Sequence, residues 1–102
     1  MQPIITENRE KIAELCRAHH VRRLSVFGSA VRDDFDPERS DVDFLVEFEP
    51  IGEMSYARNY FSLLESFDSL FGRKVDLLSD HAVKNPYLRK SIEEDRVDLY
   101  AA

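Results

Sequence analysis

The sequence predicts an α/β (α+β) fold in which a small mixed β-sheet of about four strands is flanked by helices. Short apolar segments typical of strands alternate along the chain with segments whose apolar residues recur every three or four positions, as in amphipathic helices. The chain has 102 residues and contains no linker-like or low-complexity stretch. We therefore expect a single domain over residues 1–102.

The N-terminal half is expected to contribute a helix, two strands and a short helical turn. Residues 9–19 predict the first helix, with Thr6 as its N-cap. A short strand is expected over residues 23–27, followed from Gly28 by a short helix that runs to Arg32. A polar loop over residues 33–39 leads to the clearest strand, residues 41–48. Apolar residues on one face of the first helical segment are expected in the core: Ile5, Ile12, Leu15 and Cys16.

The C-terminal half predicts a long helix over residues 54–71, ended by Gly72. A third strand is expected over residues 74–78, a helix capped by Asn85 over residues 86–94, and an edge strand over residues 97–100. The broad apolar face of the long helix belongs either in the core or at a subunit interface, and the sequence leaves homo- and hetero-oligomers open. This face comprises Tyr56, Ala57, Tyr60, Phe61, Leu63, Leu64, Phe67, Leu70 and Phe71.

Charge and composition exclude several classes of function. The formal net charge is −6, and proteins that bind nucleic-acid polymers are usually basic, so a protein or a small molecule is the expected partner. The N-terminus lacks the apolar core of a signal peptide, and no run approaches the roughly 20 apolar residues of a membrane span. The single cysteine allows no internal disulfide bond, which agrees with a reducing compartment. We therefore expect a cytoplasmic protein that does not contact a membrane.

Two aspartates interrupt the clearest strand. Asp41 and Asp43 are two positions apart, so both side chains point to the same face, with carbons about 6 to 7 Å apart. Asp76 lies within another apolar strand and would join them if the two strands are neighbours. Clustered carboxylates repel each other unless cations hold them, and oxygen-only ligands suit Mg²⁺ or Mn²⁺. The sequence therefore predicts a site for two divalent metal ions, and incidental surface aspartates would not explain three carboxylates within apolar strands.

Gly28 and Ser29 form a second predicted element of this site. A glycine lets the backbone approach a ligand closely, and main-chain amides with a serine hydroxyl can hold a phosphate. The alternative is that Gly28 serves a tight turn and Ser29 is a simple N-cap. No GxxxxGK[ST] motif is present, so the site is not a P-loop.

Three segments resemble one known family: "GSAVR" from Gly28, "SDVDFLV" from Ser40, and "KVDLL" from Lys74. Together they resemble the minimal nucleotidyltransferases of the DNA polymerase beta superfamily in type, order and spacing. The resemblance covers roughly residues 23–78. Two departures fall in the polar loop, which carries Asp33 where the family often has glycine and is one residue longer than is common.

The resemblance implies a polymerase-beta-type fold and a role for each matching residue. Asp41 and Asp43 would bind both metal ions, and Asp76 would complete the catalytic metal's shell. Gly28, Ser29 and Ser40 would contact nucleotide. Arg32 would either assist the triphosphate or brace a carboxylate.

The resemblance also implies a reaction and a partner. Many stand-alone members pair with a HEPN-domain RNase toxin and, using ATP and Mg²⁺, attach AMP to one of its tyrosines. The chain would then be the antitoxin of a type VII-like pair. Two alternatives stay open, namely an antitoxin that neutralises its partner by binding alone and a nucleotidyltransferase that modifies a small molecule.

Overall fold

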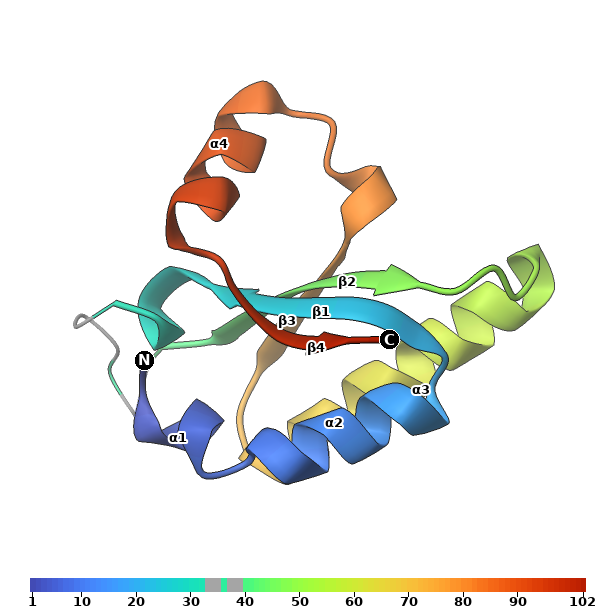
Figure 1. The fold of residues 1–102 in the computed structure, drawn as a ribbon, viewed down its shortest axis with the longest axis horizontal. Coiled ribbons are helices and arrows are strands. Elements are labelled where there is room, and N and C mark those ends of the chain that lie inside the picture. The colour runs from blue at the N-terminus through green and yellow to red at the C-terminus, as the bar shows by residue number, and fades with distance from the viewer. Residues whose placement is uncertain (33–35, 37–39) are drawn as a thin grey trace.

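One mixed sheet organises the chain in the computed structural model, which describes residues 1–32, 36 and 40–102 (Figure 1). Its strand order is β3-β2-β1-β4, where β1 pairs antiparallel with both β2 and β4 and β2 pairs parallel with β3. The predicted mixed sheet is therefore confirmed. The strands are β1 (Val21–Phe27), β2 (Val42–Phe48), β3 (Val75–Ser79) and β4 (Val97–Ala101).

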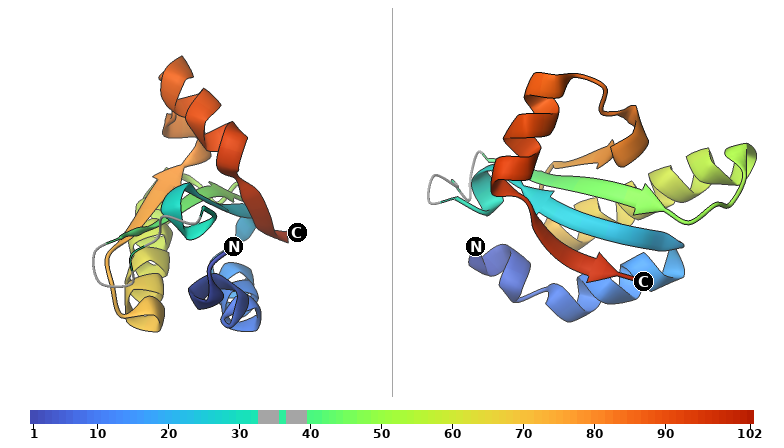
Figure 2. Two further views of the ribbon diagram at one scale, coloured as in Figure 1. Left: turned by 90° about the vertical axis from the view of Figure 1, so that its left-hand side faces the viewer. Right: turned by 45° about the horizontal axis from the view of Figure 1, so that its top comes forward.

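Helices cover both faces of this sheet. The helices α1 (Pro3–Thr6), α2 (Arg9–Ala18) and α3 (Glu53–Phe71) lie on one side, and α4 (Pro86–Asp95) lies on the other (Figures 1 and 2). Two 3₁₀ turns, η1 (Gly28–Ala30) and η2 (Asp80–Ala82), follow β1 and β3. The long α3 is the crossover that allows β2 and β3 to run parallel. Within the described residues, no helix combines the length and apolar character needed to cross a membrane.

The main core lies between the sheet and the layer of α2 and α3. Val42, Phe44 and Val46 alternate along β2 and are fully or almost fully buried. The ring of Phe44 packs 4.9 Å from that of Phe67 on α3. Cys16 is buried in the same cluster, as predicted. Leu45 on β2 is also buried but lies outside that cluster, and strand alternation places it on the opposite face of the sheet.

The predicted N-cap of the first helix is wrong, although α2 begins at Arg9 as expected. Thr6 is the last residue of α1, which the sequence analysis did not anticipate, and the residue that precedes α2 is Asn8. The Thr6 hydroxyl instead donates to the carbonyl oxygen of Pro3. A proline favours the first turn of a helix, so Pro3 begins a separate short helix here.

The apolar face of α3 is only partly used in the core. Leu63, Phe67 and Phe71 are buried, whereas Phe61 remains 63% exposed and Ala57 is exposed. The face of α3 that packs against the sheet is therefore narrower than the apolar face expected from the sequence. The capping predictions are confirmed, because Gly72 ends α3 in the left-handed conformation and the Asn85 side chain accepts hydrogen bonds at the start of α4. Most of the predicted loop, residues 33–35 and 37–39, lies outside the described residues.

Candidate active site

Three aspartates lie at the same end of two neighbouring parallel strands. Asp41 directly precedes β2, Asp43 is the second residue of β2, and Asp76 is the second residue of β3. Asp43 and Asp76 are register partners, so their side chains share one face of the sheet, and alternation places Asp41 on that face too. The strand pairing that would bring the three carboxylates together is therefore present. Their assignment as catalytic residues remains a prediction.

The carboxyl group of Asp43 is in an environment that disfavours its charge. Burial raises the pKa of Asp43 to about 7, helped by a side-chain hydrogen bond to Asp76 and by the negative charges of Asp76 and Asp41. The positive charge of Arg32 acts in the opposite direction. Below about pH 7 a protonated Asp43 can donate the hydrogen bond to Asp76.

Lys74 places its ammonium group against the other two carboxyl groups. Its Nζ atom is 3.7 Å from Asp41 Oδ2 and 3.8 Å from Asp76 Oδ1. Among the residues described, no three His, Cys, Asp or Glu side chains converge in a way that could hold a metal ion. The ammonium group places positive charge beside Asp41 and Asp76. The oxygen-only donor set still fits Mg²⁺ or Mn²⁺, provided that the proton leaves and the largely exposed Lys74 side chain moves aside.

Gly28 lies directly against this carboxylate pair. Its φ angle is +74°, in the left-handed region, and a Cβ atom at this position would lie 2.6 Å from Asp43 Oδ2. Glycine is therefore required both by the backbone conformation and by the close approach to Asp43. Ser29 follows in η1 and is half-buried. Its side chain makes no hydrogen bond within the described part of the chain, so its hydroxyl is free to contact a ligand.

Arg32 joins this end of the sheet to α4. Its Nη1 atom lies 2.5 Å from Asp95 Oδ2, at the last position of α4. The same guanidinium group is close enough to Asp43 to lower its pKa. Arg32 thus braces a carboxylate in the absence of ligand, and a role toward a triphosphate remains a prediction.

Ser40 has a structural contact of its own. Its hydroxyl oxygen accepts a hydrogen bond from the main-chain N–H of Asp36 at 2.9 Å, and its own N–H donates to the Asp36 carbonyl at 2.8 Å. Both contacts join Ser40 to Asp36. The Ser40 hydroxyl proton takes part in neither bond, so a donor contact to a nucleotide would leave both in place.

Comparison with known proteins identifies the family. The model of the nucleotidyltransferase domain family matches residues 9–99 of this chain. The chain belongs to this family. It is a nucleotidyltransferase, and relatives with assigned names share its length as well as its sequence. Protein adenylyltransferase MntA of Thermococcus cleftensis is 32% identical over 94 residues, covering 92% of this chain and 88% of that protein. A Methanocaldococcus jannaschii protein with the provisional name protein adenylyltransferase MJ1379 is 36% identical over 95 residues, covering 85% and 93%.

Solved structures confirm the fold of a minimal nucleotidyltransferase. One described provisionally by that name is 31% identical, with a TM-score of 0.69 and 95% of each chain covered. A complex described as a tri-AMPylated Shewanella oneidensis HEPN toxin with its MNT antitoxin has a TM-score of 0.65 at 18% identity. That match covers 95% of this chain and 72% of the other. At such low identity the second likeness shows the fold alone.

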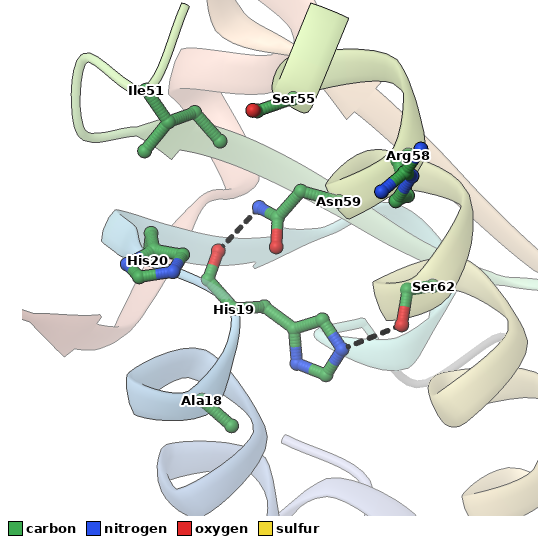
Figure 3. Close-up of a pocket in the computed structure, with 8 residues that line it drawn as sticks. All are labelled: Ala18, His19, His20, Ile51, Ser55, Arg58, Asn59 and Ser62. Carbon is green, nitrogen blue, oxygen red and sulfur yellow. Dashed lines mark hydrogen bonds between the residues drawn. The ribbon is translucent and has the colours of Figure 1, made fainter.

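Two pockets of this nucleotidyltransferase lie away from the aspartates. One of about 520 Å³ lies where the end of α2 faces the first half of α3 (Figure 3). Its wall is fixed by His19, whose Nδ1 donates to the Leu15 carbonyl and whose Nε2 therefore accepts from the Ser62 hydroxyl. The Asn59 side chain donates to the His19 carbonyl. A second pocket of about 450 Å³ adjoins it at Ile51.

Sequence reasoning missed two residues of the candidate active site. Lys74 is two positions before Asp76, so strand alternation alone could have placed both side chains on one face. Asp95 could not have been found in this way. Its contact with Arg32 joins elements distant in sequence, and no local pattern marks it.

Proposed function

We propose that this nucleotidyltransferase transfers AMP from ATP to a hydroxyl group of a HEPN-domain toxin and thereby acts as the antitoxin. The proposed acceptor is a tyrosine, and the proposed metal is Mg²⁺. The observation that carries the proposal is the in-register pair of Asp43 and Asp76, with Asp41 beside it and Gly28 packed against it. These carboxylates lie beside a glycine whose backbone packs closely against Asp43, in a chain that belongs to the nucleotidyltransferase family.

Each side chain has a proposed task. Asp41, Asp43 and Asp76 would hold the divalent ions, which when bound offset the negative charge of the phosphates during transfer. Asp43 must lose its proton first, because a protonated carboxyl group is a poor ligand. Gly28 N–H and the Ser29 hydroxyl would donate hydrogen bonds to the β- and γ-phosphates.

The transfer itself is a displacement at the α-phosphorus. The acceptor oxygen forms a bond to that phosphorus atom while the bond to the β-phosphate oxygen breaks, and pyrophosphate leaves. The hydroxyl proton would pass to the Asp76 carboxylate and from there to water. Asp76 lies on the edge strand β3, where a partner's side chain can reach it.

Relatives support the protein acceptor. The Thermococcus cleftensis relative is named a protein adenylyltransferase, and the chain covers nearly all of its length. The fold is shared with the antitoxin in a complex that holds an AMPylated HEPN toxin. A further solved structure with this fold is described as a toxin–antitoxin complex with AMP-PNP, an ATP analogue. We therefore expect a HEPN-type protein to be encoded beside this one.

Label transfer tests the proposal. The chain would be incubated with Mg²⁺, the neighbouring HEPN-type protein and ATP labelled at the α-phosphate, with γ-labelled ATP in parallel. Label from the α-position alone is expected on the partner, at a tyrosine that mass spectrometry locates. The variant Asp41→Asn/Asp43→Asn should transfer none. A matched control, Glu10→Gln/Glu14→Gln, removes two exposed carboxylates of α2 and should transfer as wild type does.

Other results would favour the alternatives. If wild type transfers no label but binds the partner tightly, and the double aspartate variant binds equally well, the chain neutralises its partner by occlusion. Label found on a small molecule but not on the partner would indicate a small-molecule nucleotidyltransferase. Transfer from γ-labelled ATP would refute AMP transfer altogether.

A further inference from the structure

The smaller of the two pockets lies at the opposite end of β2 from the aspartates. It has a volume of about 450 Å³ and forms between the end of β2, the turn into α3 and the η2 turn after β3. The proposed function assigns it no role. Its lining combines three rings with two carboxylates: Phe48, Tyr56, His81, Glu49 and Glu53.

Three rings form adjoining walls of this pocket. Tyr56 meets Phe48 edge to face, with centroids 5.2 Å apart and planes at 85°. It meets His81 in the same manner, at 5.5 Å and 74°. All three ring residues line the pocket, so aromatic surface borders the space inside it. The faces of aromatic rings attract cations through their quadrupole.

The rings are held in place before any ligand binds. The Tyr56 hydroxyl is hydrogen-bonded to the hydroxyl of Ser79 at the end of β3. His81 belongs to η2, where Arg89 of α4 donates at 2.8 Å to both the side chain and the carbonyl of Asp80. A ligand would therefore lose little affinity to ordering these side chains.

The two carboxylates at this pocket have no partner in the protein. Glu49 and Glu53 are exposed, and neither forms an ion pair or a side-chain hydrogen bond in the part of the chain that the structure describes. Arg58 lines the adjoining pocket, which shares Ile51 with this one, and is not among the residues that line this one. The pocket thus offers unneutralised negative charge next to aromatic faces, which favours a cation and disfavours an anion.

We propose that this pocket binds an arginine or lysine side chain of the partner protein. The proposal rests on the proposed function, since it supplies the docking contact for the protein that accepts AMP. Charge complementarity selects the occupant, because two glutamates without a partner among the described residues line the pocket and the whole chain has a net charge of −6. A long basic side chain also has an apolar stem that can pack against Phe48 and Ile51 while its charged end meets the glutamates.

The position of the pocket separates docking from chemistry. Asp43 and Phe48 lie near opposite ends of β2, five residues or about 17 Å apart along the strand. A partner protein can span that distance, but one side chain cannot. Loss of the contact should therefore weaken partner binding and raise the KM for the partner, with kcat largely retained.

A small cationic probe tests the pocket without the partner. N-acetyl-arginine N-methylamide would be titrated into the full chain while the aromatic NMR resonances of Tyr56 and His81 are followed. The neutral citrulline analogue would serve as the probe control. Saturable shifts are expected with arginine only, and Glu49→Gln/Glu53→Gln should weaken them at least fivefold. Equal shifts with both probes, or none with either, would overturn a cation site.

A binding measurement with the partner tests the docking role. Glu49→Gln/Glu53→Gln is expected to raise the Kd for the HEPN-type protein roughly tenfold, as expected for a partly desolvated cation contact. The charge-matched control Glu10→Gln/Glu14→Gln should change it less than twofold. Unchanged partner affinity in the first variant, even if the arginine probe binds, would overturn docking. An equal loss in the control would assign the effect to net charge and would overturn it as well.

The two proposals fail in different ways. If wild type labels its partner and Glu49→Gln/Glu53→Gln binds that partner normally, the docking proposal is wrong and the proposed function stands. If wild type labels no protein, the proposed function is wrong, and the arginine titration still decides whether the pocket binds cations.

Discussion

Replacing Asp43 with asparagine tests whether the candidate active site destabilises the metal-free fold. Burial, the hydrogen bond to Asp76 and the neighbouring carboxylates raise the pKa of Asp43 from 3.8 to about 7. Because its folded pKa is the higher one, protonated Asp43 contributes stability that is complete below about pH 3.8. That contribution is lost as the pH rises through about 7. An asparagine keeps a hydrogen-bond donor toward Asp76 and carries no charge at any of these pH values.

The expected size follows from the two pKa values. A difference of about three pH units corresponds to about 4 kcal/mol at 1.36 kcal/mol per unit. Asp43 is only half-buried, so solvent screening reduces the expected effect to about 2 kcal/mol. Asp43→Asn should therefore be more stable than wild type by about 2 kcal/mol at pH 8, and nearly equal to it at pH 4. In a domain of this size the gain corresponds to a rise in Tm of roughly 10 °C.

The free energy of unfolding of both proteins would be measured by urea denaturation, followed by circular dichroism. The buffers would contain EDTA and cover several pH values between 4 and 8. The control is Glu94→Gln, an exposed residue of α4 with no ion pair among the described residues. The free energy of unfolding of this control should stay within about 0.5 kcal/mol of the wild-type value at every pH. If Asp43→Asn is less stable than wild type at pH 8, or differs from it equally at every pH, the reasoning about Asp43 is wrong.

Three further predictions concern single contacts. Gly28→Ala should lower the free energy of unfolding by about 2 to 3 kcal/mol, whereas Gly72→Ala should lower it by about 1 kcal/mol. Both have left-handed backbones, but only the first would place a Cβ within 4 Å of another residue's atoms, so equal losses in urea would contradict a steric role. Burial raises the pKa of the Cys16 thiol to about 12, so Ellman's reagent at pH 8 should react only as fast as the chain unfolds. Reaction at the rate of a free thiol would refute this burial. The hydrogen bond from the Ser25 hydroxyl lowers the pKa of Asp98 in the folded protein. Ionised Asp98 therefore stabilises the fold at pH values above the ordinary carboxyl pKa, and this stabilisation is lost as the pH falls through the lowered pKa. Ser25→Ala should therefore lower the free energy of unfolding by about 1 kcal/mol at pH 7 and by less at pH 3. Equal losses at the two pH values, measured by thermal melting, would contradict a role for this hydrogen bond.

Much of the fold could be predicted because its elements have strong local signals. Residues 41–48 alternate and carry β-branched and aromatic side chains, and the observed β2 begins one position later. The helix α3 begins one residue earlier than predicted and ends at the expected glycine. The short α1 has four residues, too few for any periodicity to show. The turn η2 has only three residues and was not predicted.

The candidate site was predictable in part for a similar reason. A carboxylate within an apolar strand is unusual enough to be noticed at Asp43 and Asp76 without a structure. Asp43 and Asp76 lie opposite each other only because α3 brings β3 alongside β2 in this register. No local sequence pattern specifies that register. The contact of Arg32 with Asp95 and the position of Lys74 between two carboxylates likewise follow from tertiary packing.

The position of Asp76 on β3 affects how the candidate site folds and how readily it opens locally. β3 is an edge strand, hydrogen-bonded only to β2, and the whole of the α3 crossover separates the two strands in the sequence. Long-range parallel pairing is slow to form because the intervening chain must be closed first. The carboxylate cluster should thus assemble late, and native-state hydrogen exchange should find β3 opening before the central β1. Metal and nucleotide bound at the strand's edge would suppress that opening, so the ligands would themselves complete the folding of the site.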